Sequence, residues 1–351
     1  MSESEKESKR KGKRVKVNRS ETSKAASISA LFEQFLHIKI AEGRAERTIE
    51  KYRGNHTYFM EYLQLRKLDH DIRLVTASVI RDYIVWMLNE KVRFDGHRFK
   101  KDGEKTVGLS PTTVNTRVKT LRPFFRYLKE EGAIQTDPMA SVKDVREHES
   151  DITVLTVEEL RRLLNAPNQR NYDDFRDYCL INVLIDGFFR INEALSLRET
   201  DIDFESNIIT VRASIAKSRK ARSIPVQPRT IRLLRELIKE NEDFDSEYLF
   251  LANYGERLQA NHFRKQLRIY AKQAGIKKRV HPHLIRHTAA TLFLENGGSV
   301  RHLQLLMGHS DLRQVIRYTH LSNKSLAEQQ NQYSVLNDVI GKLNKERKIL
   351  R

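Results

Sequence analysis

Cysteine is almost absent from the 351-residue sequence, which contains only Cys179, within the apolar run DYCLINVLI. A single cysteine cannot form an intramolecular disulfide, and it excludes a metal centre built from several cysteine thiolates. The apolar neighbours predict that Cys179 is a buried core residue. Such sparse use of cysteine is typical of proteins in a reducing cytoplasm, so we expect a cytoplasmic location.

Acidic residues are too few to balance the basic ones. Lysine and arginine together number 64 and aspartate and glutamate 46, which gives a formal net charge of +18 at pH 7. A net charge of this size favours binding to a polyanion, and nucleic acid is the first candidate. The alternative is that the excess charge only solvates the surface.

Long apolar runs are also missing. No stretch reaches the roughly 18 apolar residues that a membrane-spanning helix needs, so we expect no membrane span. The N-terminal segment MSESEKESKRKGKRVKVNRS is polar and has no apolar centre, which argues against a secretory signal. We expect residues 1–25 to form a disordered basic tail, which either contacts nucleic acid or is simply solvated.

Helical periodicity dominates the first half of the sequence. Apolar residues recur on one helical face in three successive segments, residues 27–40, 47–65 and 76–90. A fourth helix is expected from the N-cap Ser110 to Gly132, with Pro111 suited to its first turn. Pro123 lies inside it and should cost ~3 kcal/mol or introduce a kink. We expect a helical domain over residues 26–145.

Three further segments are polar or amphipathic, one within the first expected domain and two outside the expected domains. Residues 91–108 are basic and contain glycines, which fits a DNA-contacting loop, a small hairpin or an ordinary exposed insertion. Residues 146–152, REHESDI, are short and charged, and they predict a linker. Residues 331–351 include the amphipathic stretch SVLNDVIGKLNKERKIL. We expect a C-terminal helix that docks on a neighbouring copy of the chain or packs on its own domain.

The expected second domain, residues 153–330, is mostly helical with one β patch. Thr156 and Glu159 have the spacing of a capping box, and a helix is expected over residues 174–186. The segments NIITVRA and ARSIPVQ are rich in β-branched residues and flank the basic stretch KSRK, which predicts a small antiparallel hairpin or sheet. The expected fold class is therefore mainly α with a small antiparallel β-sheet, in two domains.

The chemical signal of the sequence is a set of five polar residues in a fixed order. They are Arg190 in DGFFRINEALSLR, His283 and Arg286 in HPHLIRH, His309 in LLMGHSD, and Tyr318 in IRYTH. Arginines can neutralise a phosphate, histidines can move protons, and a tyrosine can attack phosphorus. Together these side chains can break and rejoin a phosphodiester without a metal ion.

The histidines and the tyrosine of this set also have other interpretations. His281, His283 and His287 could share a zinc ion, because histidines four residues apart can lie on one face of a helix. No acidic or cysteine ligand lies nearby and no HExxH motif is present, so we predict no metal site. Taken alone, Tyr318 would be read as a half-buried helix aromatic.

The ordered set resembles the catalytic domain of the tyrosine recombinases, the phage integrase family with its Xer members. The matching pieces are DGFFRINEALSLRETDID, AKSRKARSIPV, HPHLIRHTAATLFLENGG and LLMGHSDLRQVIRYTHLS, which cover roughly residues 153–330. Residues 27–140 resemble the family's core-binding domain more weakly, through pieces such as LSPTTVNTRVKTLRPFFRYLKEEG. One departure is GFFR, where many members read TGLR before the first arginine.

The resemblance implies a catalytic set made up of Arg190, Lys217, His283, Arg286, His309 and Tyr318. In this set Arg190 and Arg286 donate forked hydrogen bonds to the non-bridging phosphate oxygens. Tyr318 is the nucleophile, and its phenol, with an ordinary pKa near ~10, needs a base or a cationic neighbourhood. His283 is the expected general base, and His309 hydrogen-bonds the phosphate or orients its partners.

The catalytic lysine of the family usually sits in a Gly-Lys-Gly turn, whereas this chain has Ala-Lys-Ser at Lys217. Counting back from Pro225 still selects Lys217 as the donor to the leaving 5′ oxygen, with Lys220 as the competitor. Glu193 is expected to brace the site as an acceptor, or else to be an ordinary surface helix residue. The expected DNA-backbone contacts are Lys220, Arg222, Arg117, Lys119 and Arg122.

The resemblance further implies a site-specific recombinase that works through a 3′-phosphotyrosyl intermediate and needs no metal, ATP or other cofactor. It would integrate, excise or resolve mobile DNA or replicon dimers, as a homotetramer on two duplex DNA sites with inverted-repeat cores. Accessory DNA-bending proteins and a nucleoid-associated place in the cytoplasm are further expectations. The alternatives are a monomeric relaxing enzyme like a type IB topoisomerase, and a DNA-binding architectural protein without catalysis.

Overall fold

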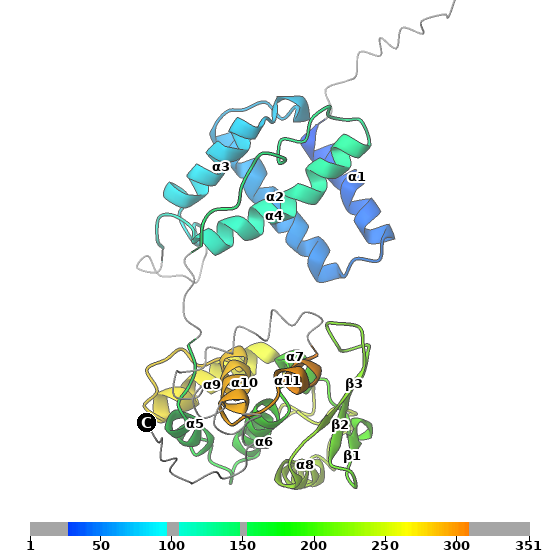
Figure 1. The fold of residues 1–351 in the computed structure, drawn as a ribbon, viewed down its shortest axis with the longest axis vertical. Helices are drawn as coiled ribbons and strands as arrows, with labels where there is room; N and C mark the ends of the chain where they lie inside the picture. Colours follow the sequence, from blue (N-terminus) through cyan, green and yellow to red (C-terminus); the bar gives the residue numbers. More distant parts are fainter. Residues whose placement is uncertain (1–26, 97–104, 148–152, 309–351) are drawn as a thin grey trace, which may run out of the picture. The chain divides into compact units, whose positions relative to one another are not determined.

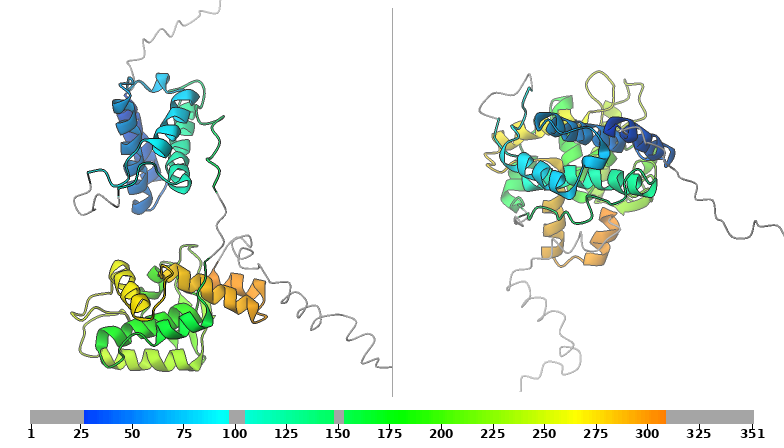
Figure 2. Two further views of the ribbon diagram at one scale, coloured as in Figure 1. Left: turned by 90° about the vertical axis from the view of Figure 1, so that its left-hand side faces the viewer. Right: turned by 90° about the horizontal axis from the view of Figure 1, so that it is seen from above.

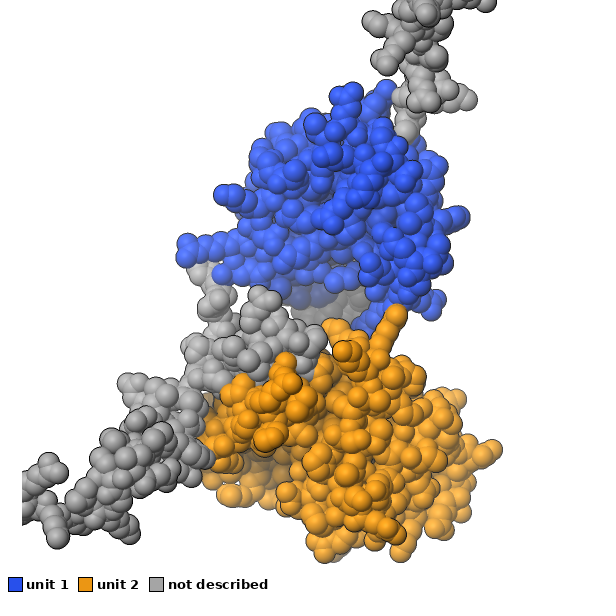
Figure 3. Space-filling model, turned by 45° about the vertical axis from the view of Figure 1, so that its right-hand side comes forward, with its two compact units in different colours: residues 1–149 blue, residues 150–351 orange. Residues whose placement is uncertain are grey.

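The computed structural model describes three stretches of the chain, residues 27–96, 105–147 and 153–308. The chain divides into two compact units, residues 1–149 and 150–351 (Figure 1 and Figure 3). Each unit has its own hydrophobic core. Several segments discussed above fall wholly or partly outside the described residues, namely 1–25, 91–108, 146–152 and 331–351.

The described part of the first unit is helical. Its elements are α1 (Ile28–Ala41), α2 (Glu46–Leu65), the 3-10 helix η1 (Ile72–Leu74), α3 (Ala77–Asn89) and α4 (Pro111–Glu130) (Figure 1). Helix α4 packs against α1, α2 and α3, so its apolar face forms the centre of this unit. The helices that apolar periodicity predicts are confirmed as α1, α2 and α3.

Aromatic side chains fill the core of the first unit. Phe124 of α4 is fully buried, and its ring centroid lies 5.4 Å from that of Phe32 and 5.6 Å from that of Phe35, both on α1. Phe59 and Phe125 are also fully buried. Edge-to-face packing of this kind adds to the free energy gained from burying the rings.

Helix α4 begins as expected and continues past its internal proline. The hydroxyl oxygen of Ser110 accepts a hydrogen bond from the N–H of Thr113 at 3.4 Å, and Pro111 occupies the first turn. The helix runs on through Pro123 to Glu130, so the proline does not end it. Burial of the apolar face that contains Pro123's neighbours offsets the cost of the missing backbone hydrogen bond.

The described part of the second unit combines helices with one small sheet. The helical elements are α5 (Val157–Leu164), α6 (Tyr172–Asp186), α7 (Ile191–Ala194), η3 (Glu199–Asp201), α8 (Pro228–Glu240), α9 (Ala260–Gln273), α10 (Pro282–Glu295) and α11 (Val300–Met307). Helix α6 is central and packs against α5, α7, α8 and α10 (Figure 1 and Figure 2). Cys179 on α6 is fully buried, as its apolar neighbours predicted.

The predicted hairpin is present and is extended by a third strand. Strands β1 (Ile202–Asp203), β2 (Ile208–Val211) and β3 (Arg222–Pro225) form an antiparallel sheet in the order β1-β2-β3. Val211 pairs with Arg222, so residues 212–221 connect the two long strands at the end of the sheet. Strand β3 also contacts α11, which brings the base of this connection beside the end of that helix.

Local signals at the start of the second unit are confirmed. The N–H of Glu159 donates to the hydroxyl of Thr156 at 3.1 Å, and the carboxylate of Glu159 accepts from the N–H of Thr156 at 2.8 Å. This reciprocal capping box starts α5. Within the stretches that the structure describes, no helix has both the length and the apolar character needed to cross a membrane.

Candidate active site

Arg190 is held at the start of α7 by a carboxylate one turn further on. Its backbone N–H donates to Oε2 of Glu193 at 3.0 Å, and its Nη1 donates to Oε1 of the same residue at 2.9 Å. Glu193 is 1% exposed, whereas the side chain of Arg190 keeps 20% exposure. Glu193 therefore fixes the position of Arg190, and part of the Arg190 side chain remains exposed.

Phe188 occupies the unusual backbone position in the GFFR sequence. Its φ is 52°, in the left-handed region that normally selects glycine, and the glycine of the family's TGLR pattern corresponds to this position. The ring is buried and packs edge-to-face on Phe293 of α10, with centroids 5.6 Å apart. It belongs to an apolar cluster that also contains Leu303 and Met307 of α11. Burial of the ring offsets the backbone strain.

Arg286 is buried, and it joins two segments of backbone that are distant in the sequence. Its Nη1 donates to the carbonyl of Phe188, and its Nη2 donates to the carbonyl of Met307 at 2.8 Å. The carbonyl of Met307 also accepts from Nη1 of Arg190 at 3.4 Å. Two arginines far apart in the sequence thus converge on one carbonyl oxygen at the end of α11.

The end of α11 suits this role because the last carbonyls of a helix have no partner within it. The helix macrodipole also places partial negative charge at this end, which favours nearby cations. Gly308 follows with φ 63° and ψ 42°, a left-handed conformation that ends the helix. His309 is the next residue in the sequence, and both His309 and Tyr318 lie outside the described residues.

His283 lies one turn before Arg286 on α10, with its side chain exposed. Loss of hydration around the ring is the largest cause that lowers its pKa, followed by the charge of Arg286. Smaller contributions come from His281, Arg264 and Arg190. A lowered pKa keeps the imidazole neutral at neutral pH, which is the form that accepts a proton.

Glu193 makes a second ion pair, with Arg222 of β3. Nη2 of Arg222 lies 2.7 Å from Oε2 of Glu193, and its Nε donates to the carbonyl of Leu306 at 3.0 Å. Burial alone would raise the pKa of Glu193, but the hydrogen bond and charge of Arg222 and then the contacts with Arg190 bring the pKa below its ordinary value. Glu193 is therefore a buried anion between two cations.

Lys217 and Lys220 are both exposed on the connection between β2 and β3. This connection is anchored at Ala216, whose side chain is buried and whose N–H donates to the carbonyl of Arg212 at 3.1 Å. A cavity of about 380 Å³ beside α11 is lined by residues of this connection and of the helix, among them Ser218, Lys220, Arg222, Arg301, Gln304 and Gly308. Lys220 therefore lies beside α11, and Lys217 lies on the same connection without lining this cavity.

The expected DNA contacts in the first unit have different surroundings. The guanidinium of Arg117 stacks over the ring of Tyr58 at 3.4 Å, and its Nη1 donates to Asn55 at 3.1 Å. Arg122 donates to the backbone carbonyls of Met139 and Val142, which ties the chain after α4 to that helix. Lys119 has the most exposed side chain of the three, at 58%, and pairs with Asp144. Their role on DNA stays a prediction.

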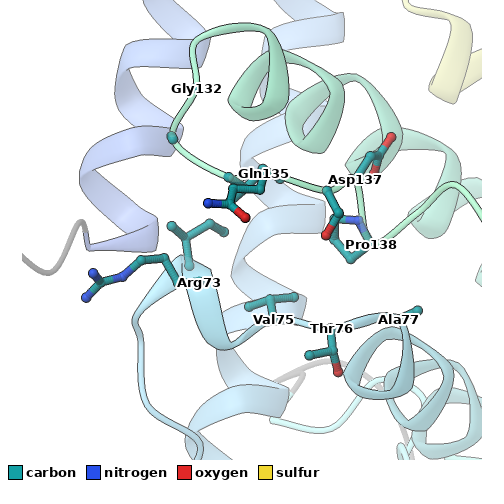
Figure 4. Close-up of a pocket in the computed structure, with 12 residues that line it drawn as sticks. Arg73, Val75, Thr76, Ala77, Gly132, Gln135, Asp137 and Pro138 are labelled. Carbon is teal, nitrogen blue, oxygen red and sulfur yellow. The ribbon is translucent and has the colours of Figure 1, made fainter. Parts of the chain in front are cut away.

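One cavity of the first unit contains none of the predicted site residues. It has a volume of about 550 Å³ and lies between the segment around Val75 and Thr76 and the turn that contains Gln135 and Asp137 (Figure 4). Among the described residues, no group of three or more His, Cys, Asp or Glu side chains could hold a metal ion. The prediction that the reaction needs no metal is not tested by this geometry.

Sequence reasoning missed the backbone acceptors of the site. The backbone carbonyls of Phe188, Leu306 and Met307 accept hydrogen bonds from the three arginines of the site. Every residue has a backbone carbonyl, so the residue types do not show which carbonyls serve as acceptors. The available signals were indirect. Gly308 in LLMGHSD marks a helix end, and the GFFR departure marks a backbone position that usually takes glycine.

Comparison with known proteins shows the family of the chain. The model of the phage integrase family matches residues 153–325. The tyrosine recombinase XerD of Listeria monocytogenes is 28% identical over 313 residues, which cover 87% of this chain and 99% of that protein. The tyrosine recombinase XerC of Chlamydia caviae is 32% identical over 216 residues, which cover 60% of this chain and 68% of that protein.

The fold is also found in a solved recombinase complex. The structure of XerH site-specific recombinase bound to a palindromic difH substrate, a post-cleavage complex, covers 86% of this chain and 83% of that one, with a TM-score of 0.65 and 22% identity. The chain therefore belongs to the phage integrase family of tyrosine recombinases, and it is a tyrosine-type site-specific recombinase that acts on DNA.

Proposed function

We propose that the chain cuts a DNA strand by attack of the Tyr318 phenol on phosphorus. The attack forms a 3′-phosphotyrosyl bond and releases a 5′-hydroxyl. Negative charge that develops on the two non-bridging oxygens is received by Arg190 and Arg286. The observation that supports this most is the meeting of both guanidiniums at the carbonyl of Met307, directly before Gly308 and His309 in the sequence.

Proton transfer is assigned to the histidines and a hairpin lysine. His283 accepts the proton of the Tyr318 phenol, because its lowered pKa keeps the ring neutral. His309 hydrogen-bonds the phosphate. Lys217, or Lys220 as the alternative, donates a proton to the departing 5′ oxygen from the exposed connection between β2 and β3.

Rejoining reverses these steps with a different strand. The 5′-hydroxyl of a partner strand attacks the phosphotyrosyl phosphorus and gives its proton to the hairpin lysine that had donated one during cleavage. The new phosphodiester forms, and the Tyr318 phenol leaves with a proton returned from His283. The protein–DNA bond conserves the energy of the original phosphodiester. No ATP is therefore needed for the overall exchange, and in this proposal the arginines, histidines and lysine do the work of a metal ion.

The assembly proposed is a homotetramer on two duplex sites, because exchange of two duplexes requires four strand cleavages and each chain supplies one Tyr318. Sites with inverted-repeat cores fit a symmetric assembly. The palindromic difH substrate of the XerH complex is a parallel in a protein of the same fold. Accessory DNA-bending proteins and a place on the nucleoid in the cytoplasm belong to the same proposal.

The C-terminal segment 331–351 is proposed to dock on a neighbouring copy and to regulate cleavage. A cavity of about 570 Å³ in the second unit offers an apolar surface of suitable size, with partly exposed Leu164, Leu292 and Phe293 in its lining. Deletion of 331–351 should reduce synapsis while monomer binding to a single site persists. Unchanged synapsis and cleavage would contradict the proposed docking of residues 331–351.

A suicide DNA substrate, nicked so that the released strand diffuses away, tests the cleavage step. Wild type should accumulate a covalent protein–DNA adduct, and Tyr318→Phe should bind the same DNA without forming it. Exchange between two sites on one plasmid then separates a recombinase from an enzyme that only relaxes supercoils. Binding without any adduct would favour an architectural protein.

A further inference from the structure

Arg222 is a predicted contact to the DNA backbone, but its side chain is turned into the protein. Only 9% of that side chain is exposed, and its fork of donors faces the carboxylate of Glu193 at 2.7 and 3.4 Å. Its Nε also donates, to the carbonyl of Leu306 at 3.0 Å. All three nitrogens of this guanidinium thus donate to protein acceptors, and its charge is paired with a carboxylate.

We infer that Arg222 is a positioning residue, an inference that rests on the proposed function. It holds three segments of the active site in place: the connection between β2 and β3, the start of α7 and the end of α11. Arg222 is the first residue of β3, so it stands at the base of the connection that carries Lys217 and Lys220. Through Glu193 it is linked to Arg190 at the start of α7. Its hydrogen bond to the carbonyl of Leu306 links it to the end of α11, two residues before Gly308.

The second contribution of Arg222 is electrostatic. Glu193 is buried, and its ion pairs among the described residues are those with Arg190 and Arg222. A buried carboxylate that lost Arg222 would draw more strongly on Arg190, its other cation, because charges interact strongly in a site with little water. Arg190 would then present less of its charge to the phosphate. Arg222 therefore keeps Arg190 available for catalysis.

The residue that packs against Arg222 from the end of α11 is a glycine, Gly308. Gly308 has a left-handed φ of 63°, and a Cβ at that position would lie 3.1 Å from Cδ and Nη1 of Arg222 and 3.2 Å from Cζ. Glycine therefore allows the end of α11 to pass directly over the guanidinium. Arg222 is therefore in contact with the last described residue before His309 in the sequence.

The test separates positioning from phosphate contact by two measurements on full-length Arg222→Lys and Arg222→Met. Single-turnover cleavage of the suicide substrate at saturating DNA should fall at least tenfold in both variants, and further in Arg222→Met. DNA affinity is measured in chains that also carry Tyr318→Phe, so that no cleavage occurs. The slope of log affinity against log salt concentration should be the same with and without the Arg222 substitution. Loss of one phosphate contact would instead reduce that slope by about 0.9.

Two comparison variants calibrate these readouts. Arg232→Lys changes an exposed arginine on α8 and should match wild type in both measurements. Lys220→Met removes an exposed lysine expected on DNA and should lower the salt slope. A further Glu193→Gln in the Arg222→Met chain should recover part of the cleavage rate, because it removes the uncompensated carboxylate. Loss of fold alone would not be repaired in this way.

The outcomes distinguish this inference from the proposed function. If wild type forms no adduct, the proposed function fails. If wild type cleaves but the Arg222 variants lower the salt slope and cleave normally at saturating DNA, Arg222 is a phosphate contact and the positioning role is wrong. Normal cleavage with an unchanged slope also contradicts the inference. If Arg222→Met does not fold, Arg222→Lys decides by cleavage alone. Lysine keeps the charge that a phosphate contact needs but cannot reproduce the bonds to Glu193 and Leu306, so normal cleavage by Arg222→Lys would contradict the positioning role.

Discussion

Arg190 and Arg286 donate to the same backbone oxygen, the carbonyl of Met307, at 3.4 and 2.8 Å. This shared acceptor fixes the spacing between two guanidiniums that come from α7 and α10. It also makes the end of α11 part of the site, since the carbonyl belongs to the last residue of that helix. Movement of α11 would therefore be transmitted to both arginines at once.

Replacing Arg286 by lysine should abolish most cleavage while DNA binding persists. The two terminal nitrogens of Arg286 reach the carbonyls of Phe188 and Met307, and one ammonium cannot reproduce this fork. We expect single-turnover adduct formation to fall by roughly 10²–10³-fold, the usual cost of removing a preorganised donor. Arg232→Lys is the matched control on an exposed surface. Cleavage within threefold of wild type would contradict the proposed role of Arg286.

Substitutions at Phe188 should separate backbone strain from side-chain burial. Phe188→Ala loses the buried ring and keeps an unfavourable φ of 52°, whereas Phe188→Gly loses the ring and relieves the strain. Both should destabilise the second unit by a few kcal/mol, as expected for loss of a buried phenylalanine. The glycine variant should be the more stable by about 1 kcal/mol. Urea unfolding measures the difference, and a more stable alanine variant would show that the strain is unimportant.

Cleavage should lose activity in acid with a midpoint below the ordinary histidine pKa of 6.5, because the pKa of His283 is lowered. Only the neutral ring accepts the phenolic proton, so the rate is high above the pKa of His283 and falls as pH drops through it. His283→Gln should be slow and should lose this acid limb. His281→Asn keeps an N-cap acceptor for α10, and its cleavage rate should still fall at low pH as in wild type. A limb that survives in His283→Gln belongs to another group.

His56 should make the first unit sensitive to acid. Its ring is buried against Phe32, with centroids 3.7 Å apart, and burial lowers its pKa to about 4, partly opposed by the charge of Glu33. A folded-state pKa below the unfolded one gives stability that is complete above the unfolded value of 6.5 and is lost as pH falls toward 4. The loss should reach about 3 kcal/mol.

His56→Phe provides the matched comparison, because the neighbouring rings of Phe32 and Phe124 suit an apolar aromatic. This variant should show a much flatter stability between pH 6.5 and pH 4. The measurement is urea unfolding of the first unit, followed by its tryptophan, Trp86, at several pH values. An equal decline in wild type and variant would assign the acid sensitivity to other groups.

Local signals in the sequence predicted the elements of the fold well. Ser110 and Thr156 start their helices as capping rules require, and apolar periodicity located α1 to α3. The hairpin followed from β-branched residues on both sides of a basic turn. These features depend on neighbours within one or two helical turns, so a single sequence contains the information.

Contacts between distant segments were not predictable in the same way. Arg122 and Arg222 are both predicted DNA contacts, and that role stays a prediction, but the sequence does not show their partners within the protein. In the structure Arg122 holds the carbonyls of Met139 and Val142, and Arg222 holds Glu193 and Leu306. The direction of a long cationic side chain depends on acceptors brought near by tertiary folding. The catalytic grouping itself came from family resemblance.

The proposal for catalysis is tested most directly by finding the residue bonded to DNA. The adduct formed on the suicide substrate is digested with protease and nuclease, and the nucleotide-bearing peptide is sequenced by mass spectrometry. We predict a phosphotyrosyl bond to the 3′ end of the cut strand at Tyr318. A covalent bond at any other residue, or to the 5′ end, would contradict the account.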